Sequence, residues 1–204
     1  MYIRDLDPVL FDFGFLVIRW YSLAYIFGIL AGWMYGKVII GREILNKNQN
    51  DYSKNFDDLI GYIIIGVILG GRLGYVIFYD PIFYLENISE IFKLWNGGMS
   101  FHGGLLGVII ATIIFSKIKG INFYYFADII SCVAPIGIFL GRVANFINGE
   151  LFGKVSNLPW AIIFPEGGNF ARHPSQIYEA VLEGVVLFLI INFLAIKKKL
   201  LLKP

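Results

Sequence analysis

The sequence is poor in charged residues. Only 16% of its 204 residues are Asp, Glu, Lys or Arg, against roughly 25% in an ordinary soluble domain. Its hydrophobic share is 57%, and a soluble domain of this size needs a larger charged shell around its core. The composition therefore excludes a disordered chain, a coiled coil and a disulfide-rich scaffold, and it indicates an integral membrane protein.

Cysteine and histidine are also scarce. Cys132 is the single cysteine, so no disulfide can form within the chain. With only two histidines, no His or Cys pair stands at metal-ligand spacing, and we predict no metal site. The net charge of +2 is too small to favour nucleic-acid binding. The sequence lacks a G-x-S-x-G elbow, a Walker loop and a dinucleotide fingerprint.

The chain is rich in long apolar segments. Five of them come close to the ~20 residues that an α-helix needs to cross a bilayer. They lack the period-2 alternation of a β-barrel, and a backbone in hydrocarbon must satisfy its own hydrogen bonds, so we predict helices. The predicted spans are 14–36, 58–79, 99–116, 123–146 and 176–196. The expected fold class is all-α, a polytopic membrane helix bundle that forms one transmembrane domain over residues 1–204.

Lys and Arg are distributed unevenly over the connections, and basic connections stay on the cytoplasmic side. One set of chain ends and connections contains most of them: Lys37, Arg42, Lys47, Lys54, Lys117, Lys119, Lys197, Lys198, Lys199 and Lys203. The opposite set contains Arg4, Lys93, Lys154 and Arg172. We therefore expect the N-terminus outside and the C-terminus in the cytoplasm, which agrees with an odd number of spans. The N-terminal residues are acidic rather than basic, so we expect the first segment to stay as an anchor.

The outer connections would then be 80–98 and 147–175, both rich in aromatic residues and glycine. Aromatic side chains of this kind suit the headgroup layer of a membrane. The first connection is compatible with a short amphipathic helix along the membrane surface and with an ordinary loop, and the sequence leaves both open.

Three arginines fall within the predicted spans: Arg19, Arg72 and Arg142. A charge at the bilayer centre costs about 2.5–3.5 kcal/mol on insertion scales, so each needs a partner or a use. Arg19 is near an outer end, where its side chain can reach the interface. Arg72 stands among glycines, which fits either a helix-packing seam or a second cation for the anion that Arg142 binds.

Arg142, Asn145 and Asn148 follow one another at three-residue steps, so they share one face of the fourth predicted helix. A guanidinium with amide donors beside it suits an anionic group such as a phosphate. The next residues would let a ligand approach the backbone closely because two of them are glycines: Gly149, Glu150 and Gly153. The stripe is expected near the outer leaflet, so it predicts a site for a phospholipid headgroup.

Four further polar residues stand near the ends of apolar segments. A lone histidine such as His102 is more often structural than catalytic, but an imidazole that titrates near neutral pH can take a proton from a thiol or hydroxyl. Glu179 and Glu183 are four residues apart on one face of the last segment. We expect a structural role for them, either paired with a buried arginine or facing water, and a structural role for His173.

Five strings of the sequence resemble the bacterial prolipoprotein diacylglyceryl transferases and occur in that family's order. They are RWYSLAYIFG at 19–28, GGRLGYVIFY at 70–79, NGGMSFHGGLLGV at 96–108, GRVANFINGELFG at 141–153 and RHPSQIYEAVLEG at 172–184. The resemblance implies an inner-membrane enzyme that moves the diacylglyceryl group of phosphatidylglycerol to the lipobox cysteine thiol of a prolipoprotein signal peptide, the first step of lipoprotein maturation. It implies membrane lipids as surroundings, no cofactor and no nucleic-acid partner.

The resemblance also assigns roles to residues by their place in these strings. It implies that His102, Arg142 and Tyr21 are catalytic. It implies a substrate-binding set that consists of Arg142, Asn145, Asn148, Gly149, Glu150 and Gly153. To this set we add Arg72, as the second cation that its position within a span suggests.

Two other hypotheses remain open at this stage. Members of the family usually continue through two further spans, whereas this sequence stops at KKKLLLKP after the fifth. One alternative is therefore a truncated, non-catalytic remnant that binds anionic phospholipid through Arg142 without turnover. The other is a small anion channel lined by Arg19, Arg72 and Arg142, which would explain the intramembrane charge but not the ordered motifs.

Overall fold

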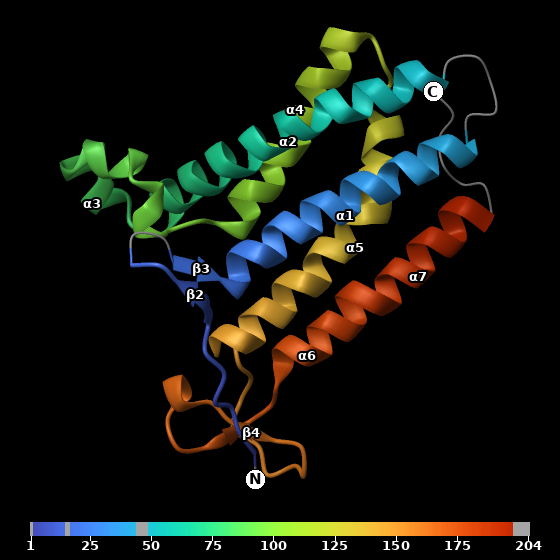
Figure 1. Cartoon of the computed structure of the whole chain (residues 1–204). Helices are drawn as coiled ribbons and strands as arrows, with labels where there is room; N and C mark the ends of the chain where they lie inside the picture. The colour runs from blue at the N-terminus through green and yellow to red at the C-terminus, as the bar shows by residue number, and fades with distance from the viewer. Residues whose placement is uncertain (1, 15–16, 44–48, 198–204) are drawn as a thin grey trace. The chain divides into compact units, whose positions relative to one another are not determined.

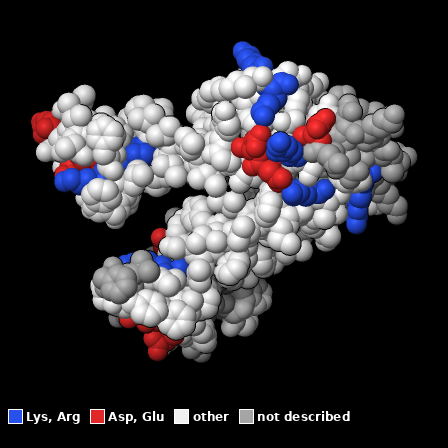
Figure 2. Space-filling view, turned by 45° about the horizontal axis from the view of Figure 1, so that its top comes forward, with Lys and Arg blue, Asp and Glu red and all other residues white. Residues whose placement is uncertain are grey.

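The computed structural model describes residues 2–14, 17–43 and 49–197 of the chain. Within this part, five helices are long and apolar enough to cross a membrane: Trp20–Arg42, Asp51–Phe78, Phe101–Lys119, Phe123–Asn148 and Ser175–Ala195 (Figure 1). The predicted bundle of about five spans is confirmed. Charged side chains occupy only a few places on the face drawn in Figure 2 and leave long uncharged stretches, as expected for a surface in contact with lipid.

The chain divides into two compact units, and each is described by itself. The first unit combines Met1–Val38 with Ile130–Leu200, and the second contains Ile39–Ile129. Helices α1 (Trp20–Glu43) and α5 (Phe123–Asn148) contribute to both units. Four basic residues used in the orientation prediction lie outside the described residues: Lys47, Lys198, Lys199 and Lys203.

In the second unit, helices α2 (Gln49–Phe78) and α4 (Phe101–Lys119) are in direct backbone contact. A Cβ placed on Gly70 would lie 2.9 Å from the Cα of Gly107, and one placed on Gly74 would lie 2.8 Å from the Cα of Gly103. Small residues let membrane helices approach this closely, and close packing replaces the hydrophobic effect that lipid does not provide. The glycines around Arg72 therefore form a packing seam.

We expect Gly70→Ala to destabilise the protein by about 1–3 kcal/mol, because the added methyl group meets the backbone of α4 and neither helix can move aside cheaply. Gly61→Ala on the same helix is the matched control, since a Cβ there has nothing within 4 Å and alanine favours a helix by about 0.5–1 kcal/mol. The check is the melting temperature of both variants in one detergent. Equal changes in melting temperature for Gly70→Ala and Gly61→Ala would contradict close packing of α2 against α4 at Gly70.

The connection between α2 and α4 folds into three short helical turns rather than one continuous helix or an irregular loop. They are α3 (Pro81–Glu86), η1 (Ile88–Phe92) and η2 (Leu94–Asn96). We call Pro81–Asn96 the outer segment, after the side of the membrane on which the distribution of Lys and Arg predicts it. Large apolar side chains on it are exposed, among them Leu85, Phe92 and Trp95.

The first unit begins with short strands. Strand β1 (Tyr2–Ile3) pairs in parallel with β4 (Ile162–Ile163), and β4 pairs antiparallel with β5 (Ala171–Arg172). These pairings attach the N-terminus to the connection that follows α5 (Figure 1).

Strands β2 (Val9–Asp12) and β3 (Val17–Arg19) form a hairpin, so the predicted start of the first span at residue 14 is wrong. The Asp12 carboxylate accepts a hydrogen bond from the Gly14 amide at 2.8 Å, which favours a turn. Val17 and Ile18 look like membrane residues in the sequence but are good strand formers. Arg19 is therefore exposed at the end of β3, before the span begins at Trp20.

The last span contains wide π-helical turns. It runs through α6 (Ser175–Glu179), η4 (Ala180–Val186), α7 (Leu187–Asn192) and η5 (Phe193–Lys197), of which η4 and η5 are π-helical. In the first unit, the buried Asn192 ties this span to two others. Its amide donates to the Cys132 carbonyl at 3.0 Å, and its oxygen accepts from the Tyr35 hydroxyl at 3.0 Å.

Candidate functional site

The last turns of α5 carry the polar stripe that the sequence predicts. Arg142, Asn145 and Asn148 are three residues apart in one continuous helix, and Asn145 is buried. The helix ends at Asn148 because Gly149 has a φ of +71°, the left-handed conformation that favours glycine. The stripe therefore stands at the very end of a span, where the chain leaves the helix.

The two asparagines of the stripe hold a carboxylate. The Asn145 amide donates to Oε1 of Glu150 at 2.8 Å, and the Asn148 amide donates to the same oxygen at 3.3 Å. The Tyr21 side chain of α1 hydrogen-bonds Asn145. Fully buried Gln176 donates to the Glu150 carbonyl at 2.7 Å. Tyr21, Asn145, Asn148 and Glu150 are thus one connected polar cluster in the first unit.

Arg142 forms ion pairs with both glutamates of the last span. Its Nη1 is 2.9 Å from Glu179 Oε2, and its Nη2 is 3.2 Å from Glu183 Oε2. Of the two structural arrangements expected for these glutamates, pairing with an arginine is confirmed. The Arg142 side chain is still 29% exposed, so the guanidinium is accessible, but an incoming anion has to share it with a carboxylate or displace one.

The glycines after α5 are enclosed by protein. A Cβ on Gly149 would lie 2.6 Å from Nη2 of Arg4, and one on Gly153 would lie 2.8 Å from the Cβ of His173. Arg4 is buried there and donates to the Ile147 carbonyl and the Glu166 carboxylate. The close approach expected for a ligand is thus made by the protein's own side chains. Nothing in the local sequence around Arg4 indicates this role.

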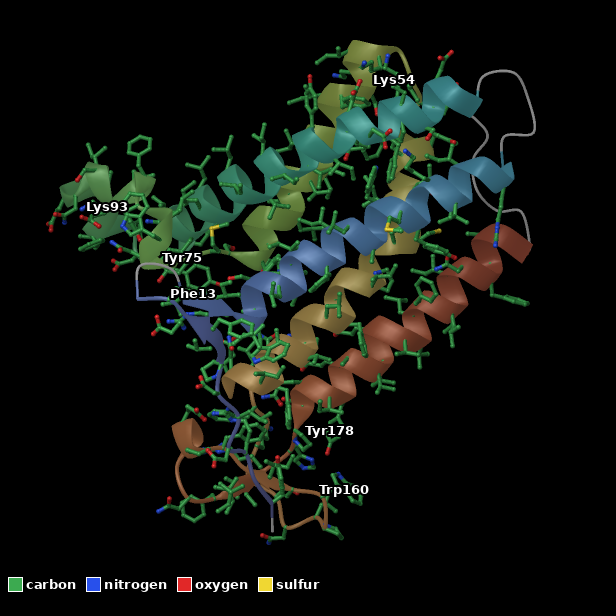
Figure 3. The ribbon with its side chains drawn as sticks, viewed as in Figure 1. Phe13, Lys54, Tyr75, Lys93, Trp160 and Tyr178 are labelled. Atoms are coloured by element: carbon green, nitrogen blue, oxygen red, sulfur yellow. The ribbon has the colours of Figure 1, made fainter. Side chains whose placement is uncertain are left out.

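A hydrogen-bonded trio fixes the start of the last span. The Trp160 indole donates to the Tyr178 hydroxyl at 2.8 Å, and Nδ1 of His173 is 3.2 Å from the same hydroxyl (Figure 3 labels Trp160 and Tyr178). These bonds tie the connection before α6 to the helix itself, which agrees with a structural role for His173.

In the second unit, Arg72 is only 4% exposed and binds the protein backbone. Its guanidinium donates at 2.5–3.4 Å to the carbonyls of five residues: Glu90, Ile91, Lys93, Gly97 and Gly98. The ring of Tyr84 lies 5.2 Å from its central carbon. Arg72 therefore fastens the outer segment to the end of α2, and its hydrogen-bonding groups are occupied by backbone rather than directed at a ligand.

His102 belongs to the second unit and is exposed in the first turn of α4. The Ser100 hydroxyl caps this turn by accepting from the Gly103 amide at 3.2 Å, and the Ser100 amide donates to the Gly71 carbonyl at 2.9 Å. The ring of Phe101 meets the imidazole edge-to-face at 5.7 Å. The helix that carries His102 is therefore held at its first residues by the end of α2.

Of the predicted site residues, the structure gathers Tyr21, Arg142, Asn145, Asn148, Gly149, Glu150 and Gly153 in the first unit. Arg72 and His102 belong to the second. Among the residues that the structure describes, no group of three or more His, Cys, Asp or Glu is placed to hold a metal ion.

Glu90 on the outer segment is held by two neighbours. Nζ of Lys93 is 2.5 Å from Glu90 Oε1, and the Asn96 amide donates to Oε2 at 3.2 Å. The hydrogen bond from Lys93 lowers the pKa of Glu90 below its usual value of 4.5. Because the pKa is lowered in the folded protein, the interaction stabilises the fold above pH 4.5 and is lost as the pH falls through the lowered value.

We therefore expect Glu90→Gln to lower the melting temperature at neutral pH, and the difference from wild type to vanish in acid. Glu86→Gln, at an exposed acid of α3, is the control and should leave the melting temperature nearly unchanged throughout. The measurement is thermal unfolding in detergent from pH 7 down to pH 3. A wild-type–Glu90→Gln difference that persists at pH 3 would refute the assigned cause.

Comparison with known proteins identifies relatives over nearly the whole chain. The family model described as prolipoprotein diacylglyceryl transferase matches residues 8–203. The phosphatidylglycerol–prolipoprotein diacylglyceryl transferase of Rhizobium meliloti (strain 1021) is 48% identical over 202 residues, which cover 98% of this chain and 72% of the relative. The protein of the same name from Paramagnetospirillum magneticum is 51% identical, and the matched residues cover 91% of this chain and 68% of that one.

The relative from Wolbachia pipientis is 52% identical over 194 residues, which cover 93% of this chain and 70% of the relative. The family resemblance seen in the motifs, and the enzyme class that it implies, are confirmed by these matches.

Proposed function

Since the chain belongs to the prolipoprotein diacylglyceryl transferase family, we propose that it transfers the diacylglyceryl group of phosphatidylglycerol to the lipobox cysteine of a prolipoprotein. The observation that supports this most directly is at the end of α5, where Arg142 shares one helix face with Asn145 and Asn148, the two amides that hold the Glu150 carboxylate. Such an arrangement suits the phosphate of a lipid headgroup and is unusual in a helix that serves only as an anchor.

The chain is a multi-pass membrane protein, and its placement follows from the same proposal. We place it in the bacterial inner (cytoplasmic) membrane, with the N-terminus outside, the C-terminus in the cytoplasm and residues 1–204 as one transmembrane domain. The end of α5 then lies in the outer leaflet. Both substrates are anchored in that membrane, so they reach the protein by lateral diffusion in the bilayer.

The reaction is a substitution at a saturated carbon. The sulfur of the cysteine forms a bond to the terminal glycerol carbon of the diacylglyceryl group, the bond from this carbon to the phosphate oxygen breaks, and glycerol phosphate leaves. A free thiol has a pKa of ~8.5, so it needs a base. The leaving phosphate needs donors that bind it more strongly as charge builds on its bridging oxygen.

For the donors that bind the leaving phosphate, we propose Arg142. A guanidinium offers two parallel N–H donors that match two phosphate oxygens, and the pair is stronger where water is scarce. Asn145, Asn148 and Tyr21 hold Glu150 just past the end of the same helix, and we propose that this polar cluster receives the headgroup glycerol. Gly149 and Gly153 serve the site indirectly, because they let Arg4 and His173 hold the turn that carries Glu150.

For the base that accepts the thiol proton we propose His102, because the unprotonated nitrogen of an exposed imidazole can accept a proton. For Arg72 we propose a positioning role in place of the direct phosphate contact expected from the sequence. It fixes Gly97 and Gly98, the residues just before the helix of His102.

The test uses purified full-length chain in phosphatidylglycerol vesicles with a synthetic signal peptide that contains a lipobox cysteine. We expect a peptide product that carries a thioether-linked diacylglyceryl group, with release of glycerol phosphate, and no product from the matched peptide with serine in place of cysteine. Binding of phosphatidylglycerol without any product would instead support a non-catalytic, lipid-binding protein.

A further inference from the structure

The two carboxylates that face Arg142 are not equivalent. Glu179 is 2.9 Å from Nη1 with 35% of its side chain exposed, whereas Glu183 is 3.2 Å from Nη2 with 48% exposed. A longer ion pair with a more exposed carboxylate is the weaker one, because its charges are farther apart and less of the carboxylate is enclosed by protein. Of the two, Glu183 is therefore the easier to remove from the guanidinium.

The backbone that carries Glu183 is unusual. Glu179 is the last residue of α6, and Glu183 lies in the π-helical turn η4. π-Helical stretches inside α-helices are rare and are frequently found at functional sites. The turn is pressed against α5, since a Cβ on Gly184 would lie 2.7 Å from the Cβ of Phe139. Phe139 precedes Arg142 by three residues, so this contact holds Glu183 on the face of α5 from which Arg142 projects.

The charges at this position do not favour a second anion. One guanidinium with two carboxylates carries a net negative charge, and each carboxylate occupies one terminal nitrogen of the fork. A phosphate that binds through both nitrogens needs these positions, and it is repelled by any carboxylate that remains. Binding of a lipid phosphate at Arg142 therefore requires at least one glutamate to withdraw.

On the basis of the proposed function, we propose that Glu183 is the carboxylate that the headgroup phosphate displaces from Arg142, while Glu179 stays and orients the guanidinium. Glu183 then competes with substrate and product alike. It lowers the affinity of the site for phosphatidylglycerol, and by returning to Nη2 it helps to expel the glycerol phosphate that the reaction leaves behind. Glu183 is in this sense a positioning residue that acts through Arg142.

The experiment measures two affinities of the purified full-length protein. Phosphatidylglycerol is titrated by mole fraction in phosphatidylcholine vesicles, and glycerol phosphate is added as an inhibitor of transfer. We expect Glu183→Gln to tighten both by about three- to fivefold, the size of effect typical for removal of one exposed ionic competitor. Glu179→Gln should tighten neither affinity, because the relief of repulsion is offset by the loss of the contact that orients the guanidinium. Glu86→Gln, which also removes one negative charge, should leave both unchanged.

Two further variants exclude an effect through folding. Glu183→Asp keeps the charge but retracts it by one methylene, so it should tighten both affinities by less than Glu183→Gln does. In an Arg142→Ala background, Glu183→Gln should change nothing, because the competition acts only through the guanidinium. If Glu183 were merely structural, neither Glu183→Gln nor Glu183→Asp would tighten binding in the presence of Arg142.

The measurements distinguish a failure of the Glu183 proposal from a failure of the proposed role of Arg142. If Glu183→Gln leaves both affinities unchanged or weakens them while Arg142→Ala abolishes phosphatidylglycerol binding, the competition is refuted and the proposed function stands. If the Arg142→Ala protein binds phosphatidylglycerol as the wild type does, Arg142 does not hold the phosphate. The proposed competition between Glu183 and the phosphate is then refuted together with the proposed role of Arg142.

Discussion

Arg142→Ala is expected to lower kcat/KM for diacylglyceryl transfer by about 10²–10³-fold, the usual loss when one donor to a developing anion is removed. The reason is that the guanidinium binds the phosphate more tightly as the bond to its bridging oxygen breaks. Arg142→Lys should recover only part of the loss, since an ammonium cannot donate in the planar fork. The measurement is the initial rate of peptide lipidation in phosphatidylglycerol vesicles.

The control for this prediction is Arg19→Gln. Arg19 is an exposed arginine at the end of β3, so its loss should leave the rate near that of the wild type. Removal of Arg142 also leaves Glu179 and Glu183 without their cation, so the melting temperature of each variant has to be compared. A folded Arg142→Ala protein with wild-type kcat/KM would show that the guanidinium takes no part in catalysis.

Arg72→Leu is expected to cost about 3–5 kcal/mol of stability or to prevent folding of the second unit. The substitution leaves five carbonyls of the outer segment and its neighbours without their charged donor in a partly buried setting, and the loss of several such hydrogen bonds together is costly. Arg72→Lys keeps the charge but cannot reach five carbonyls, so it should also be destabilising. We expect faster tryptic cleavage at Lys93, because the outer segment is no longer fastened to α2.

Arg42→Gln, at an exposed arginine in the last turn of α1, is the control and should cleave at the wild-type rate. Melting temperature and cleavage rate are to be measured on the same samples. If the Arg72→Leu protein has the melting temperature and the tryptic cleavage rate of the control, the hydrogen bonds from Arg72 do not hold the outer segment in place.

The spans were predictable from the sequence because lipid imposes a strong and local requirement. A run of about 20 apolar residues can satisfy its backbone only as a helix, so composition alone indicates the element. The same reasoning failed at residues 17–19, where Val17 and Ile18 count as apolar but pair with β2. Hydropathy measures only whether a residue prefers lipid, and it does not register a turn such as the one at Asp12.

The candidate site was predictable only where its residues share one helix. Arg142, Asn145 and Asn148 are related by helical periodicity, so their common face follows from spacing. The partners of these residues come from far along the chain. Nothing near Arg142 indicates Glu179, and nothing near Arg72 indicates the carbonyls of residues 90–98, because such contacts depend on tertiary packing.

The π-helical turn η4 was also not predicted from the sequence. The spacing of Glu179 and Glu183 suggested one face of an α-helix, and no local signal in AVLEGVV marks a wider turn. Its position follows from the contact of Gly184 with Phe139, which only the folded chain reveals.

The most direct test of the account is a distance measurement between Arg142 and the lipid phosphate. Protein with ¹⁵N-labelled arginine side chains is placed in bilayers that contain phosphatidylglycerol, and solid-state NMR detects dipolar coupling between the guanidinium nitrogens and the lipid ³¹P. The account predicts coupling at hydrogen-bonding range that disappears in Arg142→Lys. Coupling that is the same in the wild type and in Arg142→Lys, or absent from the wild type, would contradict it.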